Sequence, residues 1–144
     1  MKEDFRQELC MAGTVSELPR IVEFVDDACE QAAINPAQRF NLQLAVEEAC
    51  MNVIEHAYGG KGGEVTVCFE VDGTDVQITV TDHGKPFDPD QVAMPDLSKP
   101  LEERPVGGLG IYLMQQLMDE VEFEFSAEGN RLRMVKRRVR PETG

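Results

Sequence analysis

Residues 64–82 read EVTVCFEVDGTDVQITVTD, and this stretch decides the fold class. Apolar and polar residues alternate on both sides of the turn Asp72–Gly73. A period of two on either side of an Asp-Gly turn predicts two antiparallel strands with one buried face. The buried face is formed by Val65, Val67, Phe69, Val71, Val76, Ile78 and Val80.

The same alternation predicts strands elsewhere in the chain. A second hairpin is expected where Val121, Phe123 and Phe125 alternate and, after a turn at residues 128–130, Leu132 and Met134 follow. A further strand is expected around residues 5–11. Because the strands come in hairpins and no β-α-β unit with a G-x-G-x-x-G turn is present, the sheet should be mixed or antiparallel.

Helical spacing predicts three helices. The first spans residues 16–34 with Ser16 as its N-cap, and the second begins at Asn35–Pro36 and runs to about Tyr58. The third is short, from the glycines at 107–110 to about Met118. Residues 86–105 hold five of the eight prolines and no periodicity, which predicts a long loop. The expected fold is an α+β two-layer sandwich with the helices on one face of the sheet.

Composition excludes several classes of function. The 144 residues suit one domain, and 27 acidic against 14 basic residues give a net charge of −13. That charge repels phosphate backbones and anionic lipids, so we expect no direct nucleic-acid partner and no membrane partner. No apolar run is long enough for a span, and the acidic start is unlike a signal peptide. We therefore expect a cytoplasmic protein.

The sequence also allows predictions about the four cysteines and about the basic tail. Each cysteine lies within an apolar pattern, which predicts reduced, packed thiols without a disulfide or a zinc site. The tail at residues 136–140 is basic and is expected to fray. The cysteines are Cys10, Cys29, Cys50 and Cys68.

Three features indicate a binding site. Glu48 and Asn52 lie one turn apart on the polar stripe of an otherwise apolar helix, which indicates either a cleft or an ordinary solvated edge. Asp82 continues the buried row of its strand and is followed by Gly84; it either serves a ligand or caps a turn. Glycines 107–110 lead into a helix N-terminus, which suits a phosphate site or a simple hinge.

These three features resemble, in order, the boxes of the GHKL superfamily of gyrase-type ATPases and histidine kinases. Residues 48–52 with 56–58 resemble its N box, residues 82–88 its D-x-G box, and residues 108–110 its second glycine box. The compact length and the segment from Lys99 to Gly110 look most like the anti-sigma-factor serine/threonine kinases. The resemblance covers about residues 14–136 within a single kinase domain of residues 1–144, with an ATP lid at about 86–107.

The resemblance implies roles for individual residues. Asn52 is similar to the asparagine that holds Mg²⁺ on the phosphates of ATP, and Glu48 to the general base. Asp82 is similar to the acceptor of the adenine amino group, and Gly84 to the glycine beneath the adenine. The residues expected around the phosphates are Arg104, Gly108 and Gly110. The chain departs from the superfamily at Pro86, in place of a glycine, and at Gly129–Asn130, where Gly-Thr is common.

The implied function is an ATP-dependent protein serine/threonine kinase that acts as an anti-sigma factor. It would phosphorylate a serine of an antagonist protein and sequester a sigma factor. Dimerisation is common in the family, so a homodimer is a further candidate assembly. Two alternatives share the nucleotide residues. One is an ATP-binding regulatory module that binds partners without phosphotransfer, and the other is a fragment of a GHKL ATPase.

Overall fold

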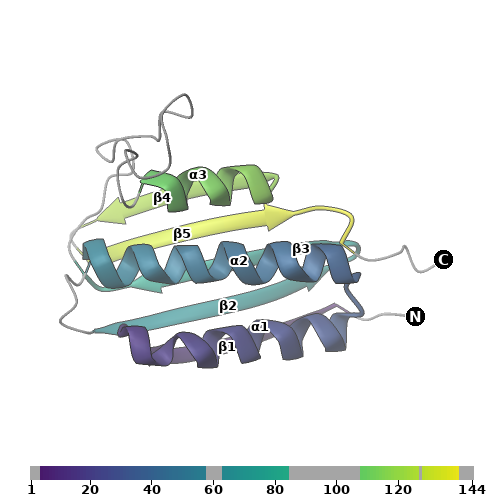
Figure 1. The fold of residues 1–144 in the computed structure, drawn as a ribbon, viewed down its shortest axis with the longest axis horizontal. Helices are drawn as coiled ribbons and strands as arrows, with labels where there is room; N and C mark the ends of the chain where they lie inside the picture. Colours follow the sequence, from purple (N-terminus) through teal and green to yellow (C-terminus); the bar gives the residue numbers. More distant parts are fainter. Residues whose placement is uncertain (1–3, 58–62, 85–107, 127, 140–144) are drawn as a thin grey trace.

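The structure is a computed structural model, and it describes residues 4–57, 63–84, 108–126 and 128–139. Within these ranges five strands form one sheet in the order β1-β2-β3-β5-β4, and every neighbouring pair is antiparallel (Figure 1). Both predicted hairpins and the N-terminal strand are confirmed. The strands are β1 (Phe5–Ala12), β2 (Glu64–Asp72), β3 (Asp75–Asp82), β4 (Glu120–Ser126) and β5 (Gly129–Lys136).

Three α-helices cover one face of this sheet, as the sequence predicts (Figure 1). They are α1 (Leu18–Ala32), α2 (Pro36–Asn52) and α3 (Gly108–Leu117), and α2 continues into a wider π-helical turn at Val53–Ala57. Helix α2 lies in the middle and packs against both α1 and α3. The fold is therefore the expected α+β two-layer sandwich, with a sheet that is antiparallel throughout.

The two long helices begin differently. Asn35 caps α2 as predicted, because its Oδ1 accepts a hydrogen bond from the Gln38 amide at 3.0 Å, and Pro36 follows in the first turn. The predicted cap at Ser16 is wrong: Ser16 lies in a 3₁₀ turn, and Glu17 precedes α1 without a side-chain cap. The helix instead starts at Leu18, with Pro19 in its first turn, where the missing proline amide is not required.

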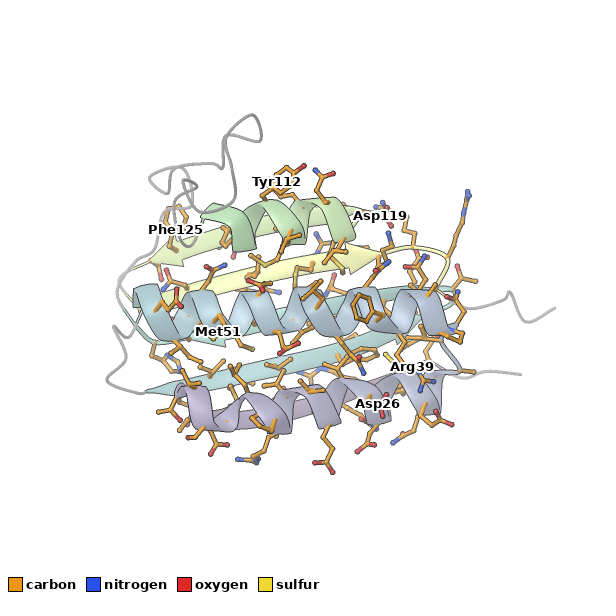
Figure 2. The ribbon with its side chains drawn as sticks, in the orientation of Figure 1. Asp26, Arg39, Met51, Tyr112, Asp119 and Phe125 are labelled. Carbon is orange, nitrogen blue, oxygen red and sulfur yellow. The ribbon has the colours of Figure 1, made fainter. Side chains whose placement is uncertain are left out.

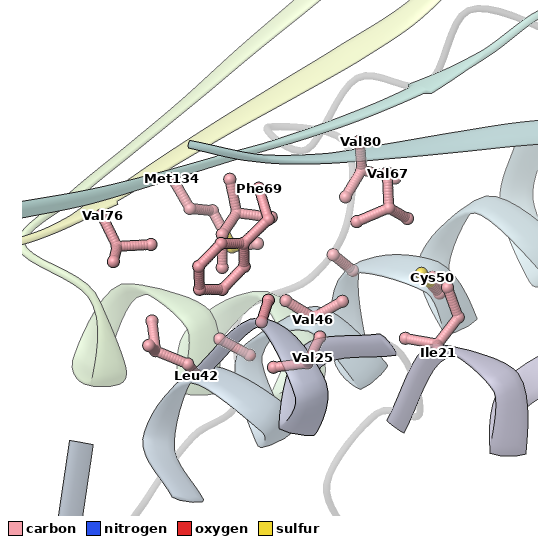
Figure 3. Packing of buried hydrophobic residues seen from close by; sticks show 14 of the residues in the cluster. Ile21, Val25, Leu42, Val46, Cys50, Val67, Phe69, Val76, Val80 and Met134 are labelled. Carbon is pink, nitrogen blue, oxygen red and sulfur yellow. The ribbon is translucent and has the colours of Figure 1, made fainter. Parts of the chain in front are cut away.

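The core lies between the helices and the sheet, and residues from both layers meet in it (Figure 3). Its largest side chain is Phe69 of β2, which is fully buried. The alternation read from the sequence is correct here, since every second residue of β2 and β3 faces the helices. Other fully buried members are Ile21, Val25, Leu42, Val46, Ile78 and Met134.

The four cysteines are unpaired, as predicted, but only three of them are packed. Cys29, Cys50 and Cys68 are buried, and burial raises the pKa of the Cys29 and Cys50 thiols to about 12. Cys10 is exposed, which corrects the prediction. The cause is the period of β1, which turns Cys10 to the face of the sheet that carries no helices.

The basic tail does not fray as far as residue 139, contrary to the prediction. Val139 is fully buried, its amide donates to the Thr74 carbonyl at 2.9 Å, and its carbonyl accepts from the Asn35 amide at 3.1 Å. The amide of Arg137 donates to Asp119 at 2.7 Å. The tail is ordered because these backbone groups find partners on the β2–β3 turn, on the start of α2 and after α3.

Candidate functional site

The predicted site residues gather at one end of the sandwich. The C-terminal end of α2, the end of β3, the start of β5 and the start of α3 all lie at this end, on the left in Figure 1. The antiparallel register fixes the strands there, with Asp82 opposite Asn130. Each polar side chain of the site is therefore carried by a regular element or by the residue that follows one.

Asp82 is the most deeply buried charged residue of the described chain, with 2% of its surface exposed. Its Oδ1 accepts two hydrogen bonds, from the Gly84 amide at 2.8 Å and from Asn130 Nδ2 at 2.9 Å. The first bond is the turn cap considered from the sequence. The second comes from another strand, so the carboxylate does more than end β3. Two donors offset much of the cost of burying it.

Asn130 was named from the sequence only as a departure from the Gly-Thr of the superfamily, and not as a site residue. It stands opposite Asp82 because Gly129 lets β5 pass unusually close to the end of β3: a Cβ on Gly129 would collide with the Asp82 carbonyl. A signal was present in the sequence, because Asn130 occupies the same alternating row as the buried Leu132 and Met134. That row faces the helices, as does Asp82.

Asn52, at the end of α2, has an unsatisfied side chain. Only 5% of the residue is exposed, and its Nδ2 is buried without a hydrogen-bond partner. A buried polar atom without a partner is rare in folded proteins and is expected to serve a ligand or a structural role. Rotation of the amide group would offer either Nδ2 to a phosphate oxygen or Oδ1 to a cation, so Asn52 fits the predicted Mg²⁺–ATP site.

Two adjoining cavities connect these residues. A narrow cavity of about 20 Å³ lies between α2 and the sheet and is lined by Asn52 and Asp82. A wider cavity of about 570 Å³ opens beside the ends of β3 and β4. Both are lined by Asp82, Asn130 and Arg131. The volume of the wider cavity is in the range of small-molecule sites.

Glu48 lies one turn before Asn52 on α2 but lines neither of these two cavities. It is half-buried. Burial raises the pKa of its carboxyl above the ordinary value of 4.5, and the nearby charges of Glu47 and Glu55 raise this pKa further. A carboxylate with a raised pKa is a stronger base, which is the property expected of a proton acceptor.

The remaining predicted residues belong to glycine segments and to the predicted lid. Gly84 is half-buried and contacts Asp82 through its amide. Gly108 and Gly110 form the first turn of α3, as predicted, so backbone amides of this turn lie at a helix N-terminus. Arg104, the lid at 86–107 and Tyr58 lie outside the described residues.

Comparison with known proteins identifies the family. Residues 11–136 match the family described as "Histidine kinase-like ATPase domain". The chain belongs to this family. The match spans both hairpins, all three helices and every site residue described above.

Curated relatives and solved structures agree with this assignment. The chain is 36% identical over 100 residues to proteins named serine-protein kinase RsbW from Bacillus cereus (strain AH820) and Bacillus anthracis. The aligned region is 67% of this chain and 62% of each relative, so the chain spans less than two thirds of these relatives.

Two solved structures share the fold. One contains the RsbU and RsbW domains of a Mycobacterium tuberculosis protein; it has a TM-score of 0.70 and 16% identity and covers 96% of this chain and 34% of that one. The other is a blue-light activated histidine kinase from Erythrobacter litoralis, with a TM-score of 0.60, 17% identity and coverage of 86% and 41%. At these identities the likeness concerns the histidine kinase-like ATPase fold alone.

In the described part of the chain, no helix combines the length and the apolar character needed to cross a bilayer.

Proposed function

We propose that the chain is an ATP-dependent protein serine/threonine kinase that acts as an anti-sigma factor. It would phosphorylate a serine of an antagonist protein and sequester a sigma factor. The observation that carries the proposal is the pairing, in one cavity, of a buried carboxylate on Asp82 with an unpartnered buried amide on Asn52. The name of the RsbW relatives supports the choice of a serine kinase.

Different site residues would contact the adenine base, the phosphates and the acceptor hydroxyl. Asp82 accepts a hydrogen bond from the adenine amino group, and Gly84 lets the flat base approach. The amides of the first turn of α3, with Gly108 and Gly110, and the side chain of Arg104 hold the phosphates. Asn52 would hold Mg²⁺, which when bound neutralises charge on the phosphates.

Glu48 would serve the acceptor. It orients the hydroxyl of the antagonist serine and takes its proton as the serine oxygen bonds to the γ-phosphorus and ADP leaves. The raised pKa of Glu48 suits this step, because it makes the carboxylate a better base near neutral pH.

A second candidate is an ATP-binding regulatory module that binds partners without phosphotransfer. The observation that favours it is that Glu48 lines neither of the two cavities shared by the other site residues. In that case Asp82 and Asn52 would bind nucleotide, and the nucleotide would act only by changing the affinity for a protein partner.

A phosphotransfer assay separates the two candidates. The protein is incubated with Mg²⁺, γ-labelled ATP and a candidate antagonist, and label on a serine of the antagonist is measured. The kinase proposal predicts transfer that depends on Mg²⁺. Nucleotide binding by calorimetry without transfer to any tested antagonist would favour the regulatory module. Absence of both binding and transfer would contradict both candidates.

A further inference from the structure

The two oxygens of the Asp82 carboxylate have different surroundings. Oδ1 accepts from the Gly84 amide and from Asn130 Nδ2, at 2.8 and 2.9 Å. Within the described part of the chain no hydrogen bond reaches Oδ2. A carboxylate held by two donors on one oxygen has a fixed orientation and one acceptor atom left for a ligand.

The donor from Asn130 is itself held in place by the backbone. Asn130 pairs with Asp82 across β3 and β5, and Gly129 allows the close approach that the pairing needs. Asn130 also lines both cavities of the site. Its side chain therefore contacts Asp82 at the border of these cavities and is carried by a regular strand.

We infer that Asn130 is a specificity-determining residue for the nucleobase. It positions the Asp82 carboxylate so that Oδ2 accepts from a purine that carries an amino group at carbon 6. This inference rests on the proposed function, since it assumes that Asp82 contacts the base of the nucleotide.

The chemistry of the two carboxylate oxygens gives the direction of the selectivity. An ionised carboxylate only accepts hydrogen bonds, so it binds a 6-amino purine and repels the 6-oxo group of hypoxanthine or guanine. The amide donor of Asn130 opposes rotation of the carboxylate. Without that donor Oδ1 keeps only the Gly84 amide, and the carboxylate is free to take other orientations.

The test compares the dissociation constants of ATP and inosine triphosphate, measured by calorimetry with Mg²⁺ on the full chain. Asn130→Asp keeps the shape of the side chain but replaces the donor with an acceptor facing Asp82. Two carboxylates at this distance repel each other, so Asp82 is no longer held with Oδ2 available to a 6-amino group. We expect the preference for ATP to fall about tenfold or more, as for the loss of one hydrogen bond to a charged group.

Two further variants keep the result interpretable. Asn130→Ala removes the donor without adding charge and should lower the preference for ATP in the same direction. Gln77→Glu is the charge control: it adds the same charge on β3, the strand that carries Asp82, at a position where Arg133 Nε already donates to the Gln77 side-chain oxygen at 2.7 Å. It should leave the preference unchanged. Melting temperatures of the free variants report on folding.

Each outcome decides the matter. A lower ATP preference in both Asn130 variants, with Gln77→Glu unchanged, supports the inference. An unchanged preference, or an equal loss of affinity for both nucleotides, would mean that Asn130 has only a structural role and would overturn it. If the wild-type protein binds ATP without preferring it, the inference is also overturned. If the wild-type protein binds neither nucleotide, the proposed function itself fails.

Discussion

At the scale of single residues, Glu48 is held where its charge is unfavourable. Its pKa is raised by burial first and by Glu47 and Glu55 second. The folded protein therefore holds this proton more tightly than the unfolded chain does. The resulting stability is complete below the ordinary value of 4.5 and is lost as the pH rises through the folded-state pKa.

Glu48→Gln should consequently raise the melting temperature at pH 7 and have little effect near pH 4, because glutamine carries no charge to desolvate. Phosphotransfer should fall about 10²-fold or more, the usual share of a positioned base, while ATP affinity stays nearly unchanged. Melting curves at several pH values and the transfer assay check both parts. Glu23→Gln, on the exposed face of α1, is the control. Wild-type transfer by Glu48→Gln would contradict the catalytic role.

Asn52 is the second residue whose removal separates folding from binding. Because its Nδ2 has no partner in the folded protein, Asn52→Ala should change the free energy of unfolding by less than about 1 kcal/mol. ATP affinity should lose most of its dependence on Mg²⁺, which calorimetry with and without the metal measures. Asn41→Ala, on the same helix, should keep that dependence. A fully retained Mg²⁺ effect in Asn52→Ala would exclude Asn52 as a ligand.

At the scale of elements, the regular patterns were predictable and the long-range contacts were not. The alternation around Asp72–Gly73 correctly predicts β2 and β3, and Asn35–Pro36 correctly predicts the start of α2. Both signals are local, since each depends on neighbours in the chain. The prediction of Ser16 as a cap was wrong because a 3₁₀ turn comes first and α1 starts only at Leu18.

The errors and omissions share a physical cause. The burial of Val139 depends on the β2–β3 turn and on Asn35, which are far away in the sequence. The basic composition of the tail therefore does not predict this burial. Likewise the bond from Asn130 to Asp82 depends on the pairing of β3 with β5, which skips β4 in the chain. The candidate site was found through Asn52 and Asp82, whose motifs are local.

The approach of β5 to β3 makes Gly129 a sensitive position. Gly129→Ala should lower the free energy of unfolding by more than about 3 kcal/mol, because its φ is +141° and the new Cβ meets the Asp82 carbonyl. Gly73→Ala is the control: its φ is +62° with open space around it, so strain alone should cost about 1 kcal/mol. Urea unfolding measures both. Equal losses of stability in the two variants would show that the contact with the Asp82 carbonyl does not contribute to the cost of Gly129→Ala.

The docked tail should also contribute to stability. Val139→Ala removes two buried side-chain carbon atoms. It should therefore lower the free energy of unfolding by about 2 kcal/mol. Val15→Ala is the matched control, since Val15 is 60% exposed and should have almost no effect. Chemical denaturation of both variants provides the comparison. A Val139 variant as stable as the wild type would indicate a tail that contributes nothing.

At the scale of the whole molecule, the net charge of −13 opposes compaction. Ion pairs such as Arg133–Glu122 and Arg39–Asp26, the latter joining α2 to α1 (Figure 2), are partly exposed and individually weak. Raising the salt concentration from about 0.01 M to about 0.15 M shortens the screening length from about 30 to about 8 Å. The melting temperature should therefore rise. A fall would mean that the attractive pairs outweigh the general repulsion.

The β2–β3 turn holds both ends of the described chain. Asp4 Oδ1 accepts from the Gly73 amide at 2.8 Å, and the Val139 amide donates to the neighbouring Thr74 carbonyl. This turn lies at the opposite end of the sheet from Asp82. A biosensor chip or a fluorescent fusion attached through either terminus would thus leave the cavities facing away from the support. Immobilised protein should then titrate with nucleotide as freely as protein in solution.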